Sequence, residues 1–183
     1  MTKNKITGPT VLTIFRMLLV IPFMISCLME GLAPKIVALT LFSIAAITDK
    51  IDGNWARKTH QVTDMGAFLD PLADKMLVDL AFLVLVYMNI IPIWMFAVII
   101  VRDLAVDGMR MMAARDGITI AASMWGKVKT TFQMITLIAI LANTIFSNEY
   151  IGIVNNILLY VSIALTIISG LDYLVKGWKK VIK

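Results

Sequence analysis

Aspartates are the residues of this sequence whose spacing points most directly to chemistry. Five of them fall within Thr48–Met76, a segment of an otherwise apolar chain: Asp49, Asp52, Asp64, Asp70 and Asp74. The first two are three residues apart and the last two are four apart, and both spacings put a pair on one face of a helix. Two antiparallel helices joined by a short loop would therefore bring four carboxylates together. Asp64 stands outside both pairs and is expected to be an ordinary loop acid.

Four ionised carboxylates in a partly desolvated place repel one another and need cations to neutralise them. Hard divalent cations with oxygen ligands meet that need, and Mg²⁺ is the usual ion where phosphates complete the coordination. Two such ions about 4 Å apart can hold the attacking and leaving oxygens of a phosphoryl transfer. Small residues nearby leave room for a ligand beside the backbone, and an arginine offers forked donors to a phosphate. These residues are Gly53, Ala56, Gly66 and Arg57.

The elements that must position these carboxylates are expected to be membrane helices. The 183-residue chain is 60% apolar and only 16% charged, and its mean hydropathy is +0.87. Soluble domains are usually about half apolar and a quarter charged. We therefore expect one all-α integral membrane domain over residues 1–183. The single cysteine, Cys27, allows no intramolecular disulfide and is expected to be a small buried apolar residue.

About six segments are long and apolar enough to cross a bilayer, which takes about 20 residues each. They are Val11–Met29, Pro34–Thr48, Pro71–Ile91, Pro92–Ala114, Met124–Phe146 and Ile151–Val175. Arg16 interrupts the first segment and no cleavage site follows it, so we expect a permanent helix rather than a signal peptide. Pro34 and Pro71 suit the first turn of a helix. Pro92 separates two helices, and Pro22 predicts a kink in the first.

Lysine and arginine predict the orientation of these helices. If the N-terminus lies in the cytoplasm, nearly all basic residues fall at or near the cytoplasmic face, and the opposite loops keep only Lys35. The aspartates then lie at the cytoplasmic boundary. We expect a polar cavity open to the cytoplasm, in a multi-pass protein of the plasma membrane whose net charge of +5 attracts anionic headgroups. The charge gives little support for nucleic-acid binding.

The aspartate segment resembles the signature of the CDP-alcohol phosphotransferase family. Eight fixed positions match at the family spacing, D-x2-D-G-x2-A-R-x8-G-x3-D-x3-D from Asp49 to Asp74. The resemblance implies about six transmembrane helices, a homodimer, and a reaction in which an acceptor alcohol displaces CMP from a CDP-linked donor. It implies two divalent ions, Mg²⁺ with Mn²⁺ as the alternative, held by Asp49, Asp52, Asp70 and Asp74. It implies that Asp74 is also the general base, and that CDP binds at Gly53, Ala56, Arg57 and Gly66.

Three further segments resemble the bacterial phosphatidylglycerophosphate synthases of that family. They are Pro9–Arg16, Val101–Arg110 and Ala121–Thr130. Two positions depart from the subfamily, where asparagine is usual at Thr10 and a small hydroxyl residue is frequent at Asp107. This resemblance implies CDP-diacylglycerol as donor and glycerol 3-phosphate as acceptor, giving phosphatidylglycerophosphate and CMP.

Glycerol 3-phosphate is a dianion, so its pocket needs cations. Arg110 and Lys127 are the best candidates, because they lie near the cytoplasmic ends of their helices. Arg16 lies deeper, and an intramembrane arginine is a functional candidate by default. Arg102 lies deeper too, and the alternative to a functional role is a structural ion pair with Asp103 or Asp79. Asp107 lies one helical turn before Arg110 and could pair with it.

Three other readings stay open at this point. The acceptor could be inositol phosphate, which is also anionic, or serine, which needs fewer cations. A divalent-cation transporter would also use an acidic cluster, although it would be expected to place carboxylates near the bilayer midplane. A structural subunit without activity is disfavoured by the intact set of four aspartates.

Overall fold

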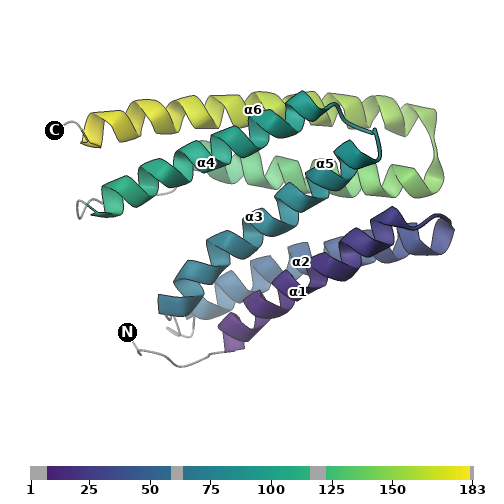
Figure 1. The fold of residues 1–183 in the computed structure, drawn as a ribbon, viewed down its shortest axis with the longest axis horizontal. Coiled ribbons are helices and arrows are strands. Elements are labelled where there is room, and N and C mark those ends of the chain that lie inside the picture. The colour runs from purple at the N-terminus through teal and green to yellow at the C-terminus, as the bar shows by residue number, and fades with distance from the viewer. Residues whose placement is uncertain (1–7, 59–63, 116–122, 182–183) are drawn as a thin grey trace.

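The fold is a bundle of helices in two groups that diverge toward the chain termini. The computed structural model describes residues 8–58, 64–115 and 123–181 (Figure 1). The helices are α1 (Gly8–Leu28), α2 (Leu32–Lys58), α3 (Asp64–Tyr87), α4 (Ile93–Arg115), α5 (Met124–Phe146) and α6 (Glu149–Val181). In one group α1 packs against α2 and α3, and in the other α6 packs against α4 and α5. Contacts of α5 with α2 and α3, and of α3 with α4, join the groups.

Four helices are long and apolar enough to cross a membrane by length and composition: Thr10–Leu28, Leu32–Asp49, Met124–Phe146 and Glu149–Val175. The other two, α3 and α4, are 24 and 23 residues long, about 35 Å at 1.5 Å per residue, and carry charges within their length. The described part of the chain contains no strand. These observations confirm the predicted all-α membrane fold.

Polarity is distributed as in a membrane protein, with apolar side chains outside and polar ones inside. Large apolar side chains on every helix are exposed, whereas seven of the twelve buried polar side chains among the described residues lie on α5 and α6. There Gln133 Nε2 donates to Thr166 Oγ1 at 3.3 Å, and Asn155 Nδ2 donates to the carbonyl of Ala139 at 3.3 Å. Such hydrogen bonds join helices where water is scarce.

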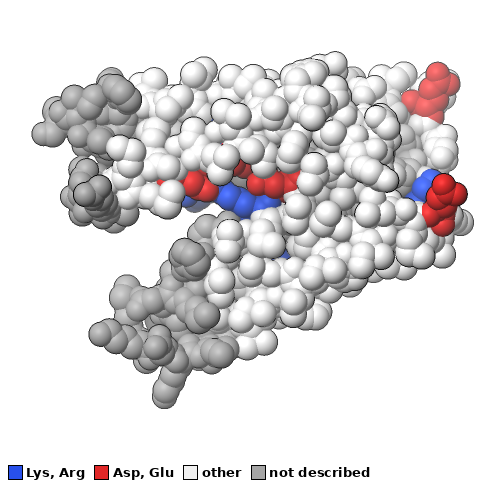
Figure 2. All heavy atoms as spheres, viewed as in Figure 1, with Lys and Arg blue, Asp and Glu red and all other residues white. Residues whose placement is uncertain are grey.

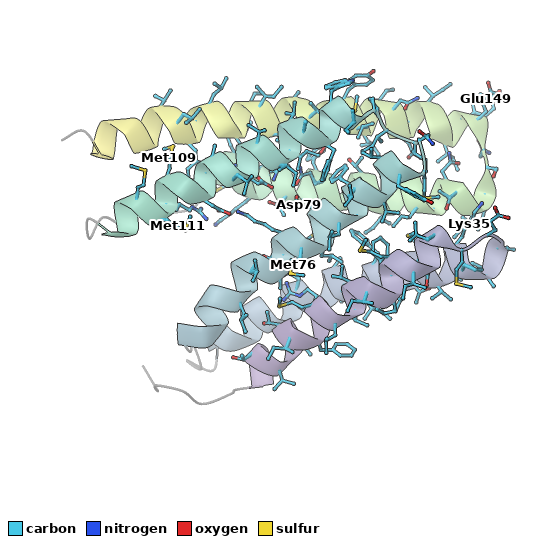
Figure 3. All side chains as sticks on the ribbon, in the orientation of Figure 1. Lys35, Met76, Asp79, Met109, Met111 and Glu149 are labelled. Carbon is cyan, nitrogen blue, oxygen red and sulfur yellow. The ribbon has the colours of Figure 1, made fainter. Side chains whose placement is uncertain are left out.

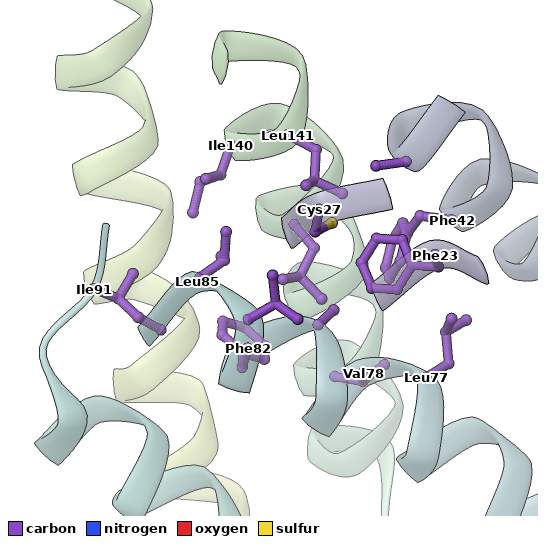
Figure 4. Close-up of a cluster of buried hydrophobic side chains, with 14 of the residues drawn as sticks. Phe23, Cys27, Phe42, Leu77, Val78, Phe82, Leu85, Ile91, Ile140 and Leu141 are labelled. Atoms are coloured by element: carbon purple, nitrogen blue, oxygen red, sulfur yellow. The ribbon is translucent and has the colours of Figure 1, made fainter. Parts of the chain in front are cut away.

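The apolar core takes side chains from all six helices (Figure 4). Phe23 and Phe42 pack there with ring centroids 5.6 Å apart and ring planes tilted by 47°, and Phe82 and Leu85 of the same cluster are fully buried. Cys27 is buried against the same cluster, as predicted. The core fixes the mutual position of α1, α2 and α3, the helices that carry the signature and Arg16.

Two helix boundaries differ from the predicted spans. α2 continues to Lys58, through the first half of the signature, and α3 begins at Asp64, seven residues before Pro71. Pro71 is therefore inside α3, and its predicted place in a first turn was wrong. Pro34 does lie in the first turn of α2. Pro92 separates α3 from α4, as predicted, and its carbonyl accepts a hydrogen bond from the amide of Met95 at 3.1 Å.

Candidate active site

Two signature carboxylates meet at one buried arginine. Asp49 of α2 and Asp74 of α3 each contact the same nitrogen, Nη1, of Arg16 on α1. The Arg16 side chain is 0% exposed, whereas those of Asp49 and Asp74 are 26% and 38% exposed. The guanidinium therefore closes the inner side of the pair, and the two carboxylates remain accessible from the outer side.

The remaining signature residues lie on the same two helices. Asp52, Gly53, Ala56 and Arg57 are in α2, and Gly66 and Asp70 are in α3. Their side chains fall outside the part of the chain whose side chains are described. Helical spacing nevertheless places Asp52 one turn after Asp49, and Asp70 one turn before Asp74. The backbone positions are compatible with four carboxylates between the two helices, and their meeting stays a prediction.

The donor chemistry suits a hard divalent cation. Among the described side chains no group of three metal-ligating residues occurs, since two of the four aspartates are not among them. The two that are described approach from different helices and converge on one positive charge. Carboxylate oxygens with this convergence are the ligands that Mg²⁺ takes in phosphoryl-transfer sites. The residues present therefore fit the ion that the signature implies.

Arg16 was a predicted ligand of the acceptor phosphate. The structure places it on Asp49 and Asp74, so its visible role is to neutralise two signature carboxylates. The contact depends on α1 packing against both α2 and α3, which the pattern of one helix does not reveal. Whether Arg16 also binds a phosphate stays a prediction.

Arg110 is held by a tyrosine from the last helix. Its Nη2 donates a hydrogen bond to Tyr173 Oη, and its guanidinium carbon lies 5.1 Å from the centre of the Tyr173 ring, within the range of a cation–π contact. The amide of Ser123 also donates to Tyr173 Oη at 3.0 Å. Tyr173 is itself buried. A single tyrosine in an apolar helix gave no sequence signal for this contact.

Lys127 lies on α5 with an exposed side chain. No hydrogen bond or ion pair involves its ammonium among the described residues. Its predicted role as a second ligand of the acceptor phosphate stays a prediction, with the side chain free to reach a ligand.

A buried charge network joins α4 and α5. Lys129 Nζ donates to both carboxylate oxygens of Asp103 at 2.8 Å, and Arg102 Nη1 donates to Asp103 Oδ1 at 2.7 Å. Arg102 also lies against Gly170 of α6, where an added Cβ would stand 2.9 Å from Arg102 Cγ. The structure therefore places Arg102 in the structural pairing with Asp103 that was its alternative. Lys129 was missed as a partner, although a lysine within an apolar helix was the available signal.

Charged side chains gather in a hollow between the two groups of helices (Figure 2). Lys35 and Glu149 lie instead at the end of the bundle away from both termini (Figure 3). Asp79 of α3 is labelled midway along the bundle, near α5. On the face seen in Figure 2, a surface without Lys, Arg, Asp or Glu separates the charged side chains of the hollow from those at the far end of the bundle.

The chain matches a known protein family along most of its length. The sequence model of CDP-alcohol phosphatidyltransferases matches residues 6–168. A CDP-diacylglycerol–glycerol-3-phosphate 3-phosphatidyltransferase of Bacillus subtilis (strain 168) is 42% identical over 139 residues, which cover 76% of this chain and 72% of the relative. Its namesake in Haemophilus influenzae is 39% identical over 175 residues, 93% of this chain and 92% of the relative. That of Salmonella choleraesuis is 43% identical over 173 residues, 91% and 92% of the two chains.

Proposed function

This chain belongs to the CDP-alcohol phosphatidyltransferase family, and we propose that it transfers the phosphatidyl group from CDP-diacylglycerol to glycerol 3-phosphate. The products are phosphatidylglycerophosphate and CMP. Relatives that carry the name of this reaction are similar over most of the chain. The observation that carries the proposal to the site is the meeting of Asp49 and Asp74 at Arg16, because it brings the two halves of the signature together.

The signature aspartates are proposed to hold two divalent ions. The family is generally dependent on divalent metals, and the ligands here are Asp49, Asp52, Asp70 and Asp74, with Mg²⁺ preferred and Mn²⁺ as the alternative. When bound, the ions neutralise the diphosphate of the donor and the charge that develops on the leaving phosphate. Arg16 contacts Oδ1 of Asp49 and Oδ1 of Asp74 from the inner side and so holds two of the carboxylates in place.

Asp74 is proposed to act as the general base. Its partly exposed carboxylate takes the proton from the primary hydroxyl of glycerol 3-phosphate. That oxygen bonds to the phosphorus attached to diacylglycerol, and the bond from this phosphorus to the CMP oxygen breaks. CMP leaves with the electron pair. Gly53, Ala56, Arg57 and Gly66 bind the CDP moiety in this scheme, and Arg110, Lys127 and Arg16 supply positive charge for the acceptor phosphate.

Replacing Arg57 with alanine is expected to weaken the donor more than the acceptor. Arg57 lies one residue after Ala56 on α2, within the nucleotide-binding half of the signature, and its forked donors suit a diphosphate. The apparent KM for CDP-diacylglycerol should rise roughly tenfold or more, while that for glycerol 3-phosphate changes little. Steady-state kinetics with each substrate varied in turn measure both values. A rise confined to the acceptor would place Arg57 in the other pocket.

The hollow is proposed to face the cytoplasm of the cell in which the protein is made. The end of the bundle opposite the termini is poor in basic residues, with Lys35 beside loops that contain no Lys or Arg, and the positive-inside rule assigns such an end to the outer face. The acyl chains of the donor stay in the bilayer and its nucleotide enters the hollow. The protein is proposed to form a homodimer in the plasma membrane.

An acceptor panel tests the proposed function. Purified protein with Mg²⁺ and CDP-diacylglycerol is offered glycerol 3-phosphate, serine or inositol phosphate, and CMP release is measured. Of the three acceptors, we expect only glycerol 3-phosphate to give rapid release of CMP. Faster release with serine or inositol phosphate would retain the family reaction and reject this acceptor. No release with any of them, in protein that binds donor, would reject the transferase and reopen the cation-transport alternative, which family membership disfavours.

A further inference from the structure

One ion pair beside the proposed base has no part in the mechanism above. Lys75 directly follows Asp74 on α3, and its ammonium contacts Oδ2 of Asp107 on α4. The two side chains are 29% and 37% exposed, so the pair is neither sealed in the core nor fully solvated. It connects the helix of the proposed base with the helix that carries Arg110, across the two groups of helices.

Asp107 has a candidate ion-pair partner nearby in the sequence, and it does not pair with that residue. Arg110 lies three residues later on the same helix, a spacing at which opposite charges normally interact. The structure describes the side chains of Asp107, Arg110 and Lys75, and no ion pair joins Asp107 to Arg110. Asp107 is engaged by Lys75 from α3, and Arg110 by Tyr173 from α6. Asp107 and Arg110 lie on one face of α4, yet each contacts a different neighbouring helix.

We propose that Lys75 is a positioning residue for the acceptor site: by holding Asp107, it leaves the guanidinium of Arg110 free to bind the acceptor's phosphate. The inference rests on the proposed function, in which Arg110 binds that phosphate. The partner of Arg110 in the described part of the chain, Tyr173, is a neutral phenol, so the positive charge is not neutralised. Arg110 Nε is buried and has no hydrogen-bond partner among the described residues, which leaves a donor for a ligand.

A carboxylate competes directly with a phosphate for arginine, because both accept forked, charge-assisted hydrogen bonds from it. If Lys75 loses its charge, the cation nearest to Asp107 along its helix is Arg110. Asp107 then turns toward Arg110 and opposes acceptor binding by occupying its donors and by repelling the dianion.

The test is a double-mutant cycle on acceptor kinetics. Lys75→Met is expected to raise the KM for glycerol 3-phosphate about three- to tenfold, a modest effect because the pair is partly solvated. The KM for CDP-diacylglycerol should change less than about twofold. Asp107→Asn alone should stay near the parent, and Lys75→Met/Asp107→Asn should return to it, because no acid is left to compete. Lys75→Arg should retain the parental KM, as should Lys35→Met, which removes a lysine at the far end of the bundle.

The outcomes separate this inference from the proposed function. If the parent uses glycerol 3-phosphate normally but Lys75→Met leaves its KM unchanged, the inference fails alone. If the double variant is as impaired as Lys75→Met, Lys75 contacts the acceptor itself and the positioning role is rejected. If the parent does not release CMP with glycerol 3-phosphate, the proposed function fails and the inference with it.

A chemical rescue covers the case in which Lys75→Met does not purify. Lys75→Cys is made in a Cys27→Ala background, which leaves one thiol, and the purified protein is alkylated with 2-bromoethylamine or with iodoacetamide. The first restores an ammonium at nearly the lysine length, and the second gives a neutral side chain of similar bulk. Recovery of the acceptor KM with the ammonium alone is expected, and equal KM values after both treatments would overturn the inference.

Discussion

Replacing Asp74 with asparagine is expected to lower the rate of CMP release at least about 100-fold, the usual effect of removing a general base. Asparagine keeps the size of the side chain but neither takes a proton nor offers a charged ligand to a divalent ion. Asp70→Asn, one helical turn earlier, is expected to reduce turnover as strongly through loss of a metal ligand. CMP release at saturating donor, acceptor and Mg²⁺ measures the effect.

The variant should still insert and purify, because Arg16 keeps Asp49 as a partner when Asp74 loses its charge. Thermal unfolding in detergent checks this independently of activity. Glu149→Gln is a matched control, since it removes one exposed carboxylate at the end of the bundle away from the termini and should leave turnover unchanged. Activity of Asp74→Asn within a few-fold of the parent would remove Asp74 from both the base and the metal roles.

The fold was predictable where hydropathy alone determines the ends of a membrane span. The predicted span Met124–Phe146 coincides with α5, and the polar residues Ser147, Asn148 and Glu149 mark its C-terminal end. The predicted membrane spans stop at the signature, whereas α2 and α3 continue beyond their apolar parts into the polar segment. Hydropathy marks where the bilayer ends, whereas a helix ends where its backbone hydrogen bonding stops, so the two boundaries differ most where polar residues carry function.

The site was predictable in its composition and less so in its contacts. Periodicity placed Asp49 and Asp74 on facing helices, and the structure brings them to one guanidinium. The contact of Arg16 with these two aspartates could not be deduced from the sequence, because contact between helices depends on how they pack in three dimensions. The partner of Asp107 could not be deduced for the same reason: spacing along α4 left a pair with Arg110 open, and a lysine from α3 contacts Asp107 instead.

Arg110 is the residue on which the choice of acceptor depends, and Arg110→Ala is expected to lower kcat/KM for glycerol 3-phosphate roughly 10- to 150-fold. This range corresponds to about 1.5–3 kcal/mol for a charge-assisted contact. The donor's KM should change less. Lys127→Ala is expected to act in the same direction, toward the lower end of the range, because its exposed side chain keeps more of its interaction with water. Kinetics with the acceptor varied at saturating donor measure both variants.

Two further variants distinguish a phosphate ligand from a structural cation at position 110. Arg110→Lys should recover only part of the loss, because a point charge replaces a planar fork that reaches the phosphate while one arm holds Tyr173. Asp107→Ala/Arg110→Ala should keep the high acceptor KM, since Asp107 is engaged by Lys75 rather than by Arg110. If removing Asp107 instead restored most of the activity, Arg110 would act mainly by neutralising that acid. The acceptor phosphate would then have to be assigned to other cations of the hollow, and the preference for a phosphorylated acceptor over serine would lose its main support.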